Sequence, residues 1–245
     1  MIPSSRLVIL VLCLGLGSIA GKTFIGRGPA VVHAQVGSIS FVSVSGKGTG
    51  GTGNVQVTAP PSLQENDILI AGVMVSSSST VTMSSEWTEI TNQTNPSLYL
   101  FWHRYSGTNP DFLATISAGS QSPTMGIAVF RGCKRTGSPV NTTGGGSSGT
   151  DESIEITGLT PSVANCMLVM VAAAEDDNTI SAIPSGSTTA FEDGAVNCFK
   201  NTLGTPDALL GLWYKAHTTG ATGDLPATQS ALDAWQSRMI ALEPE

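Results

Sequence analysis

The sequence predicts an all-β fold, a two-sheet, jelly-roll-like β-sandwich made of two tandem repeats of about 100 residues each. Two nearly uninterrupted apolar runs of strand length, residues 66–75 (NDILIAGVMV) and 165–174 (NCMLVMVAAA), are typical of strands buried on both faces. Gly accounts for 28 of 245 residues and 12% of residues are charged, a composition typical of many short strands joined by turns. Similar segments also recur at a spacing of about 100 residues, which indicates a duplicated unit.

The charged residues are unevenly distributed along the chain. The net charge is −7 and the isoelectric point is near 4.9, which argues against a nucleic-acid partner, because such proteins carry a basic face. All 18 acidic residues lie at or after Glu65, whereas the residues before it include Lys and Arg. A basic, acid-free head before an acidic body is typical of an exported chain. We therefore expect an extracellular location: secreted, on a cell surface or in a virion.

The head itself resembles a signal peptide. Residues 1–6 are a short positive leader, and residues 7–21 are apolar with small residues towards their end. This run is short for a membrane span, which needs about 20 residues. Small residues favour cleavage after Ala20 or after Ala34. We expect residues 1–34 to be a signal-like leader.

The first repeat begins with alternating strands. Residues 39–44 (ISFVSV) and 55–59 (VQVTA) are expected strands on either side of a Gly-rich turn at 46–54. The turn contains a literal G-x-G-x-x-G, but a dinucleotide fingerprint must open a helix and this one leads into a strand. We expect a hairpin loop there.

The two repeats match when one is shifted along the sequence relative to the other. The shift needed takes three values that grow along the chain, as expected if the loops of the second repeat carry insertions. The matches are residues 55–58 with 154–157 at an offset of 99, residues 98–105 with 209–216 at 111, and residues 114–118 and 127–128 with 227–231 and 240–241 at 113.

These matches predict the domain organisation. We expect repeat one at residues 35–139, a Gly/Ser/Thr linker at 140–150 and repeat two at 151–245. The linker contains a literal G-x-S-x-G without the apolar strand and helix that a nucleophile elbow needs. Repeat two lacks a clear first strand matching residues 39–44, which favours sheets shared between the repeats.

The aromatic strands of the two repeats supply candidate ligand-binding residues. Flat rings can stack on the apolar face of a sugar, so a carbohydrate site would use Trp102 and Trp213, or His103, Tyr105 and Tyr214 from the opposite face. The alternative is that these side chains fill the core.

Glu175, Asp176 and Asp177 follow the second apolar run and form a candidate calcium site, since Ca²⁺ takes several oxygen ligands. The alternative is a solvated turn, because no calcium-loop pattern accompanies them. We expect no cofactor.

Cys133, Cys166 and Cys198 follow the leader at wide spacings that match no zinc or redox motif. A single disulfide is one alternative, and three buried thiols are the expectation. The three histidines have no metal or triad spacing to Cys or Asp.

Several structural motifs resemble those of duplicated β-sandwich proteins found in phage particles and among secreted bacterial surface proteins. They are Trp87-Thr88, Phe130-Arg131-Gly132, Pro184-Ser185-Gly186 and the terminal Trp235 with Ile240-Ala241-Leu242-Glu243-Pro244. In that group a Pro-x-Gly-Trp turn is common; here repeat one keeps the Trp and repeat two keeps the Pro and Gly. The resemblance implies a virion or surface role and transfers no catalytic residue.

We therefore expect a non-enzymatic structural or adhesive protein acting outside the cell, in a phage particle, filament or cell-surface assembly. A carbohydrate-binding module is the first alternative and a secreted hydrolase the second. Expected partners are copies of itself or other surface or virion proteins, with glycans as a further candidate and no nucleic acid. The β-prone residues 30–44 could fill the missing first strand of repeat two, in the same chain or in a neighbouring copy.

Overall fold

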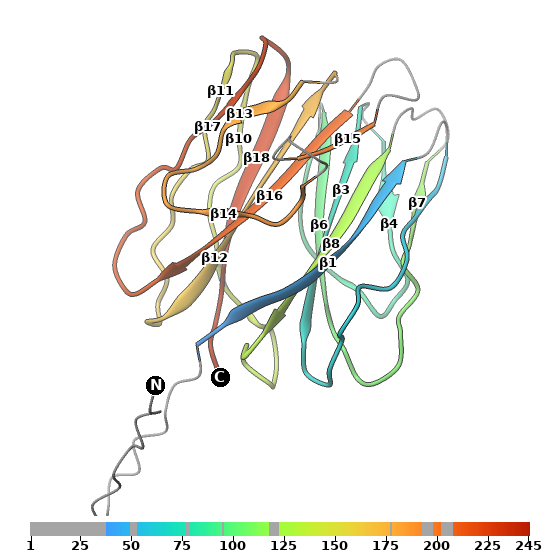
Figure 1. The fold of residues 1–245 in the computed structure, drawn as a ribbon, viewed down its shortest axis with the longest axis vertical. Coiled ribbons are helices and arrows are strands. Elements are labelled where there is room, and N and C mark those ends of the chain that lie inside the picture. The colour runs from blue at the N-terminus through green and yellow to red at the C-terminus, as the bar shows by residue number, and fades with distance from the viewer. Residues whose placement is uncertain are drawn as a thin grey trace, which may run out of the picture. The chain divides into compact units, whose positions relative to one another are not determined.

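A computed structural model of the protein describes residues 38–49, 53–76, 79–94, 96–117, 123–176, 178–192, 198–201 and 208–245 (Figure 1). These residues form 18 strands in antiparallel sheets and no helix, which confirms the predicted all-β class. Within these ranges no helix is long and apolar enough to cross a membrane. The leader at 1–34 and its cleavage points lie outside the described residues.

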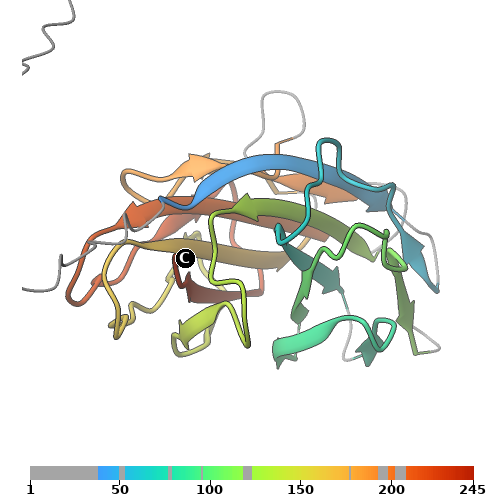
Figure 2. The same cartoon turned by 90° about the horizontal axis from the view of Figure 1, so that it is seen from below.

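The first half of the body, β1–β8, contains a large sheet and a small one. The large sheet has the order β1-β8-β3-β6-β5, and the small sheet has the order β2-β7-β4. The bounds are β1 Ser40–Thr49, β2 Val55–Gln56, β3 Ile68–Val75, β4 Val81–Thr82, β5 Thr88–Gln93, β6 Ser97–Arg104, β7 Leu113–Ile116 and β8 Thr124–Arg131. In Figure 2 the long curved β1 (blue) runs beside β8, its partner in the sheet.

The second half, β9–β18, is built from the same two kinds of sheet. Its large sheet has the order β10-β18-β12-β16-β14, with β9 also on β18 and β15 also on β16, and its small sheet is β11-β17-β13. The bounds are β9 Val140–Thr143, β10 Ser147–Gly149, β11 Ser153–Ile154, β12 Cys166–Glu175, β13 Ile180–Ala182, β14 Thr188–Thr189, β15 Phe199–Asn201, β16 Ala208–His217, β17 Ala227–Gln229 and β18 Trp235–Leu242.

The four sheets are stacked around three apolar cores. A central core lies between the two large sheets, and an outer core in each half lies between its large and its small sheet. In Figure 1 the small sheet of the second half (β11, β13, β17) and that of the first half (β4, β7) lie on opposite sides of the large sheets. The structure therefore has four sheets, and the expected two-sheet arrangement is wrong in this respect.

This stacking explains the two uninterrupted apolar runs. Along β3, Ile68 and Ile70 face the central core, while Leu69 and Ala71 face the outer core of the first half. Every residue of β3 is buried, because layers cover both faces of its sheet. The second run forms β12 at the corresponding place in the other large sheet, with all but its last residue buried. Runs that lack alternation thus mark the middle strands of middle layers.

An Asn in the left-handed region precedes each of these two strands. Asn66 has φ 72° and Asn165 has φ 60°, and Asn adopts this region more readily than other residues with a Cβ. Their N–H groups donate to the carbonyls of Tyr105 and Thr218, both at 2.9 Å, so each Asn ties the start of its strand to the end of the neighbouring strand.

The expected linker at 140–150 is wrong for most of its length. Val140–Thr143 and Ser147–Gly149 are β9 and β10, which pair with β18 as β1 pairs with β8. The first strand of the second half is therefore present, and the sheets are not shared between the halves. The sequence does not indicate this strand, because it is polar, and an edge strand that is partly exposed needs no apolar alternation.

This finding also removes the vacancy on which the expected strand exchange depended. Residues 40–49 form β1 on their own half of the body, and β9 and β10 occupy the corresponding place in the other half.

The expected register of the aromatic strands is wrong by one residue. Trp102 pairs with Ile70, and Tyr214 pairs with Val169. Ile70 and Val169 both face the central core, so Trp102 corresponds to Tyr214 and not to Trp213. A slip of one residue moves a side chain to the other face of a sheet, and Trp213 indeed lies in the outer core of the second half.

Candidate functional site

The five aromatic and imidazole candidates do not converge on one surface. The indole of Trp213 is fully buried in the outer core of the second half. Tyr214 packs at the border of the central core, where its ring stacks on Phe41 with 4.8 Å between centroids and 15° between planes. These two neighbouring side chains thus serve different cores, and both rings are used in packing.

His103 and Tyr105 belong to the outer core of the first half. His103 is buried, and its Nδ1 lies 2.8 Å from the carbonyl oxygen of Glu86, so this nitrogen donates the hydrogen bond. Its ring lies 5.4 Å from that of Trp87. Tyr105 is half-buried against the same core. His103 therefore ties the loop before β5 to β6.

Trp102 is the candidate that borders an open groove. The groove has a volume of about 310 Å³ and lies between β5 of the first half and β9 of the second. Its walls are Thr88, Glu89, Ile90, Trp102, Ser138, Val140 and Thr143. Trp102, Ile90 and Val140 also pack against the border of the central core, so they give the groove an apolar floor.

The acidic candidates lie at the end of β12. Glu175 is half-buried, Asp176 is exposed, and Asp177 lies outside the described residues. Burial raises the pKa of Glu175, and the nearby charge of Asp233 raises it further. Among the residues that the structure describes, no three His, Cys, Asp or Glu side chains are grouped to hold a metal ion. The charge of Asp233 acts on Glu175 and that of Asp176 acts on Asp233, so these carboxylates repel one another.

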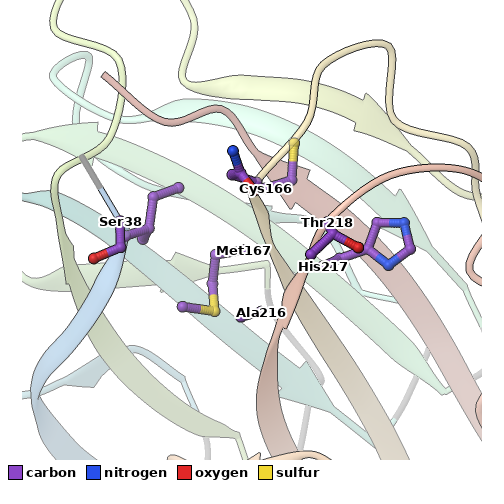
Figure 3. A pocket seen from close by; sticks show the side chains of 8 residues that line it. Ser38, Cys166, Met167, Ala216, His217 and Thr218 are labelled. Carbon is purple, nitrogen blue, oxygen red and sulfur yellow. The ribbon is translucent and has the colours of Figure 1, made fainter. Parts of the chain in front are cut away.

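A second hollow, of about 340 Å³, lies between the residues just before β1 and the paired strands β12 and β16, and contains both a thiol and an imidazole (Figure 3). Cys166 and His217 are paired across the two strands, so their side chains share one face. In Figure 3 the two groups point in different directions. The thiol donates to the carbonyl of Val163 at 3.4 Å, and Nε2 of His217 lies 2.9 Å from the carbonyl oxygen of Gly220.

This arrangement is not that of an activated thiol. A nucleophilic cysteine needs a lowered pKa, whereas burial raises the pKa of Cys166, and the charge of Glu243 raises it further. Burial likewise raises the pKa of Cys133 to about 12. Cys133, Cys166 and Cys198 are all buried and are not joined by a disulfide.

Sequence reasoning identified Trp102 but missed the rest of its groove. Ile90 and Glu89 lie on β5, and Val140 and Thr143 lie on β9, in a segment interpreted as a linker. The groove brings together two halves of the chain, and the expected register gave no reason to place these strands side by side.

Comparison of the chain with protein-family models, with curated proteins and with solved structures found no match.

Proposed function

We propose that the protein is a non-enzymatic structural or adhesive module that acts outside the cell, in a phage particle, filament or cell-surface assembly. The observation that carries this proposal is the central core, which buries the two large sheets against each other along both central strands. The two halves form a single body through this core, as expected of a module that must keep its form in an assembly. Its partners are copies of itself or other surface or virion proteins, and its acidic charge disfavours nucleic acid.

The same proposal includes a duplicated origin, with each half a jelly-roll-like unit. In the second half we count β9 and β10 together as its first strand and treat β15 as an addition, so that β18 is its eighth strand. Both large sheets then have the order first, eighth, third, sixth. Both small sheets join the second, seventh and fourth strands. This division of eight strands between two sheets is that of a jelly roll.

Matching hydrogen bonds support the duplication. In the first half, the N–H of Thr80 donates to Oγ of Ser117 at 3.0 Å, and the N–H of Ser117 donates to the carbonyl of Thr80 at 2.9 Å. In the second half, Thr179 and Ser230 make the same two bonds at 3.0 and 2.9 Å. Two unrelated sandwiches have no reason to share a reciprocal pair of this kind at the same strand ends.

Ion pairs at the end of the chain also join the halves. Lys134 pairs with Glu243 at 3.1 Å and Arg135 pairs with Glu245 at 2.7 Å. The N–H of Lys134 donates to the carbonyl of Glu243 at 2.8 Å. These contacts join the segment after β8 to the segment after β18.

The location is tested by expressing the full chain in a bacterial cell and separating medium, envelope and cytoplasm. We expect the protein outside the cytoplasm, with an intact mass that lacks residues 1–20 or 1–34. Full-length protein that stays in the cytoplasm would overturn the extracellular role.

The absence of catalysis is tested on the exported protein with chromogenic esters and glycosides. We expect no turnover above that of the buffer. Turnover that disappears on His217→Ala or Cys166→Ala would instead identify the hollow beside β12 as an active site.

A further inference from the structure

The two borders of the central core differ in one side chain. At the border formed by β1 and β16, the ring of Phe41 lies flat on Tyr214. At the border formed by β9 and β6, the corresponding residues are Val140 and Trp102. Phe41 pairs with Phe130 on β8, and Val140 pairs with Leu242 at the equivalent place on β18. In the same way, Tyr214 on β16 and Trp102 on β6 hold equivalent places in their sheets.

The groove at Trp102 therefore lies where, at the other border, an aromatic ring packs. Valine is much smaller than phenylalanine and leaves one side of the indole uncovered, and the groove of about 310 Å³ opens at this place. This volume is at the lower end of the range of about 300–1,000 Å³ for pockets that hold small ligands. The site has a stacking surface and room for one further ring.

We propose that this groove binds a pyranose ring of a glycan, which stacks on Trp102 in the place that Phe41 takes on Tyr214. The apolar floor of Trp102, Ile90 and Val140 matches the apolar face of the sugar. The remaining walls carry hydroxyls from Thr88, Ser138 and Thr143 and a carboxylate from Glu89. One carboxylate oxygen of Glu89 accepts from Nδ2 of Asn92, and Oγ of Ser138 bonds to the backbone of Val140, so the other carboxylate oxygen and the two Thr hydroxyls are the groups offered to a ligand.

Those polar groups decide between a sugar and the aromatic side chain of a partner protein. Hydroxyls and a carboxylate around a flat apolar surface bind the edge hydroxyls of a sugar, and a phenyl ring offers them no partner. The proposal rests on the adhesive form of the proposed function and gives it a ligand class. Export and assembly are measured separately, so they can hold while sugar binding fails.

Iodide quenching of tryptophan fluorescence reports mainly on this groove, because iodide reaches an exposed indole and not a buried one. The chain has four tryptophans. Trp87, Trp213 and Trp235 are 7%, 0% and 3% exposed, whereas Trp102 is half-buried. The test titrates the folded full chain with hexasaccharides of glucose, N-acetylglucosamine, mannose and galactose, and with polygalacturonate as an acidic probe. We expect a saturable change in emission with at least one of them, and protection of the signal from iodide quenching.

The deciding variant is Val140→Phe, which copies the Phe41 arrangement into the groove. We expect it to fold, because the equivalent pair of positions accommodates two rings at the other border, and to weaken binding at least tenfold. Leu232→Phe places the same ring on an exposed loop outside the groove and should leave the affinity unchanged. Glu89→Gln keeps the shape of the groove and should weaken binding by roughly two- to tenfold, which tests the proposal even if Val140→Phe does not fold.

Three results would overturn the proposal. The first is no saturable signal with any of the five probes. The second is wild-type affinity in folded Val140→Phe, or in Glu89→Gln should Val140→Phe not fold. The third is saturable binding of N-acetyl-tyrosine amide without binding of any sugar, which would assign the groove to an aromatic side chain of a protein partner.

Discussion

Replacing Gly126 by alanine should destabilise the protein, whereas the same change at its strand neighbour Gly72 should not. The two glycines are paired in register on β8 and β3. A Cβ added to Gly126 would lie 2.7 Å from Cζ of Phe191 and 2.7 Å from Cε2 of Phe199. A Cβ added to Gly72 would lie 3.5 Å from Leu210 and Phe191, which is ordinary van der Waals contact. One position is too close for a methyl group and the other has room for one.

The magnitude follows from what must move. The rings of Phe191 and Phe199 stack at 4.7 Å and 9°, so a methyl group at Gly126 has to displace both by about 1 Å. Overpacking of a core by one methyl group costs about 1–3 kcal/mol. Alanine also restricts the unfolded chain more than glycine, which returns about 0.4–1 kcal/mol in both variants. Gly126→Ala should therefore lose about 1–2 kcal/mol, and Gly72→Ala should be neutral or gain up to about 1 kcal/mol.

Urea unfolding measures both variants against the wild type. Far-UV circular dichroism and tryptophan fluorescence should give one common transition, because the central core joins both halves. Equal stability of the two variants would refute the close approach of the two large sheets at Gly126. Two separate transitions would refute the shared core.

Three further predictions concern charged groups and a thiol. Asp67 is 1% exposed and accepts two hydrogen bonds from Arg131 at 2.8 Å. Arg131→Gln leaves this buried carboxylate without its cation, so it should lower the free energy of unfolding in urea by about 3 kcal/mol, which is more than Asp67→Asn should cost. A larger loss in Asp67→Asn would contradict this. Because burial raises the pKa of Cys133 to about 12, its thiol should not react with a disulfide reagent at pH 8 until the protein is unfolded, and reaction with the native protein would be contrary evidence. Burial raises the pKa of Asp233, and the charge of Asp176 raises it further, so the folded protein loses stability as pH rises through the raised pKa. Asp233→Asn should be more stable than the wild type by a few tenths of a kcal/mol at pH 7, and the gap in Tm should close as the pH falls below about 4, where the carboxyl is protonated in both states. A gap that widens towards acid would be inconsistent with the raised pKa.

The sequence predicted the strands of the interior better than those of the edges. An apolar run of strand length that lacks alternation indicates a strand buried on both faces. Residues 68–75 and 166–174 are buried in this way. An edge strand such as Val140–Thr143 needs no such pattern, because only part of it faces a core. The hydrogen bonds that hold it to β18 come from the backbone and leave no trace in the side chains.

The candidate rings were harder to place for a different reason. A sugar site spread over one face of the aromatic strands requires that this face meets solvent, but β6 and β16 lie within middle layers and have cores on both faces. Alternation then cannot say which ring is exposed. Trp102 borders solvent because its neighbour across the core border is Val140, and this neighbour is set by the packing of two sheets that lie far apart in sequence.

Comparing the two halves separates residues that build the fold from those available for another role. Where both halves keep the same interaction, as in the Thr–Ser pairs at the ends of the small sheets, the need is structural. Where they differ, folding alone does not dictate the side chain. The Phe41–Tyr214 stack demonstrates that a second ring fits at such a border, so folding did not require a small residue at Val140. A small residue there leaves an indole uncovered on the surface, which costs hydrophobic stabilisation unless a ligand covers it. The difference between the halves is thus the reason to look for a ligand at Trp102 and not at Tyr214.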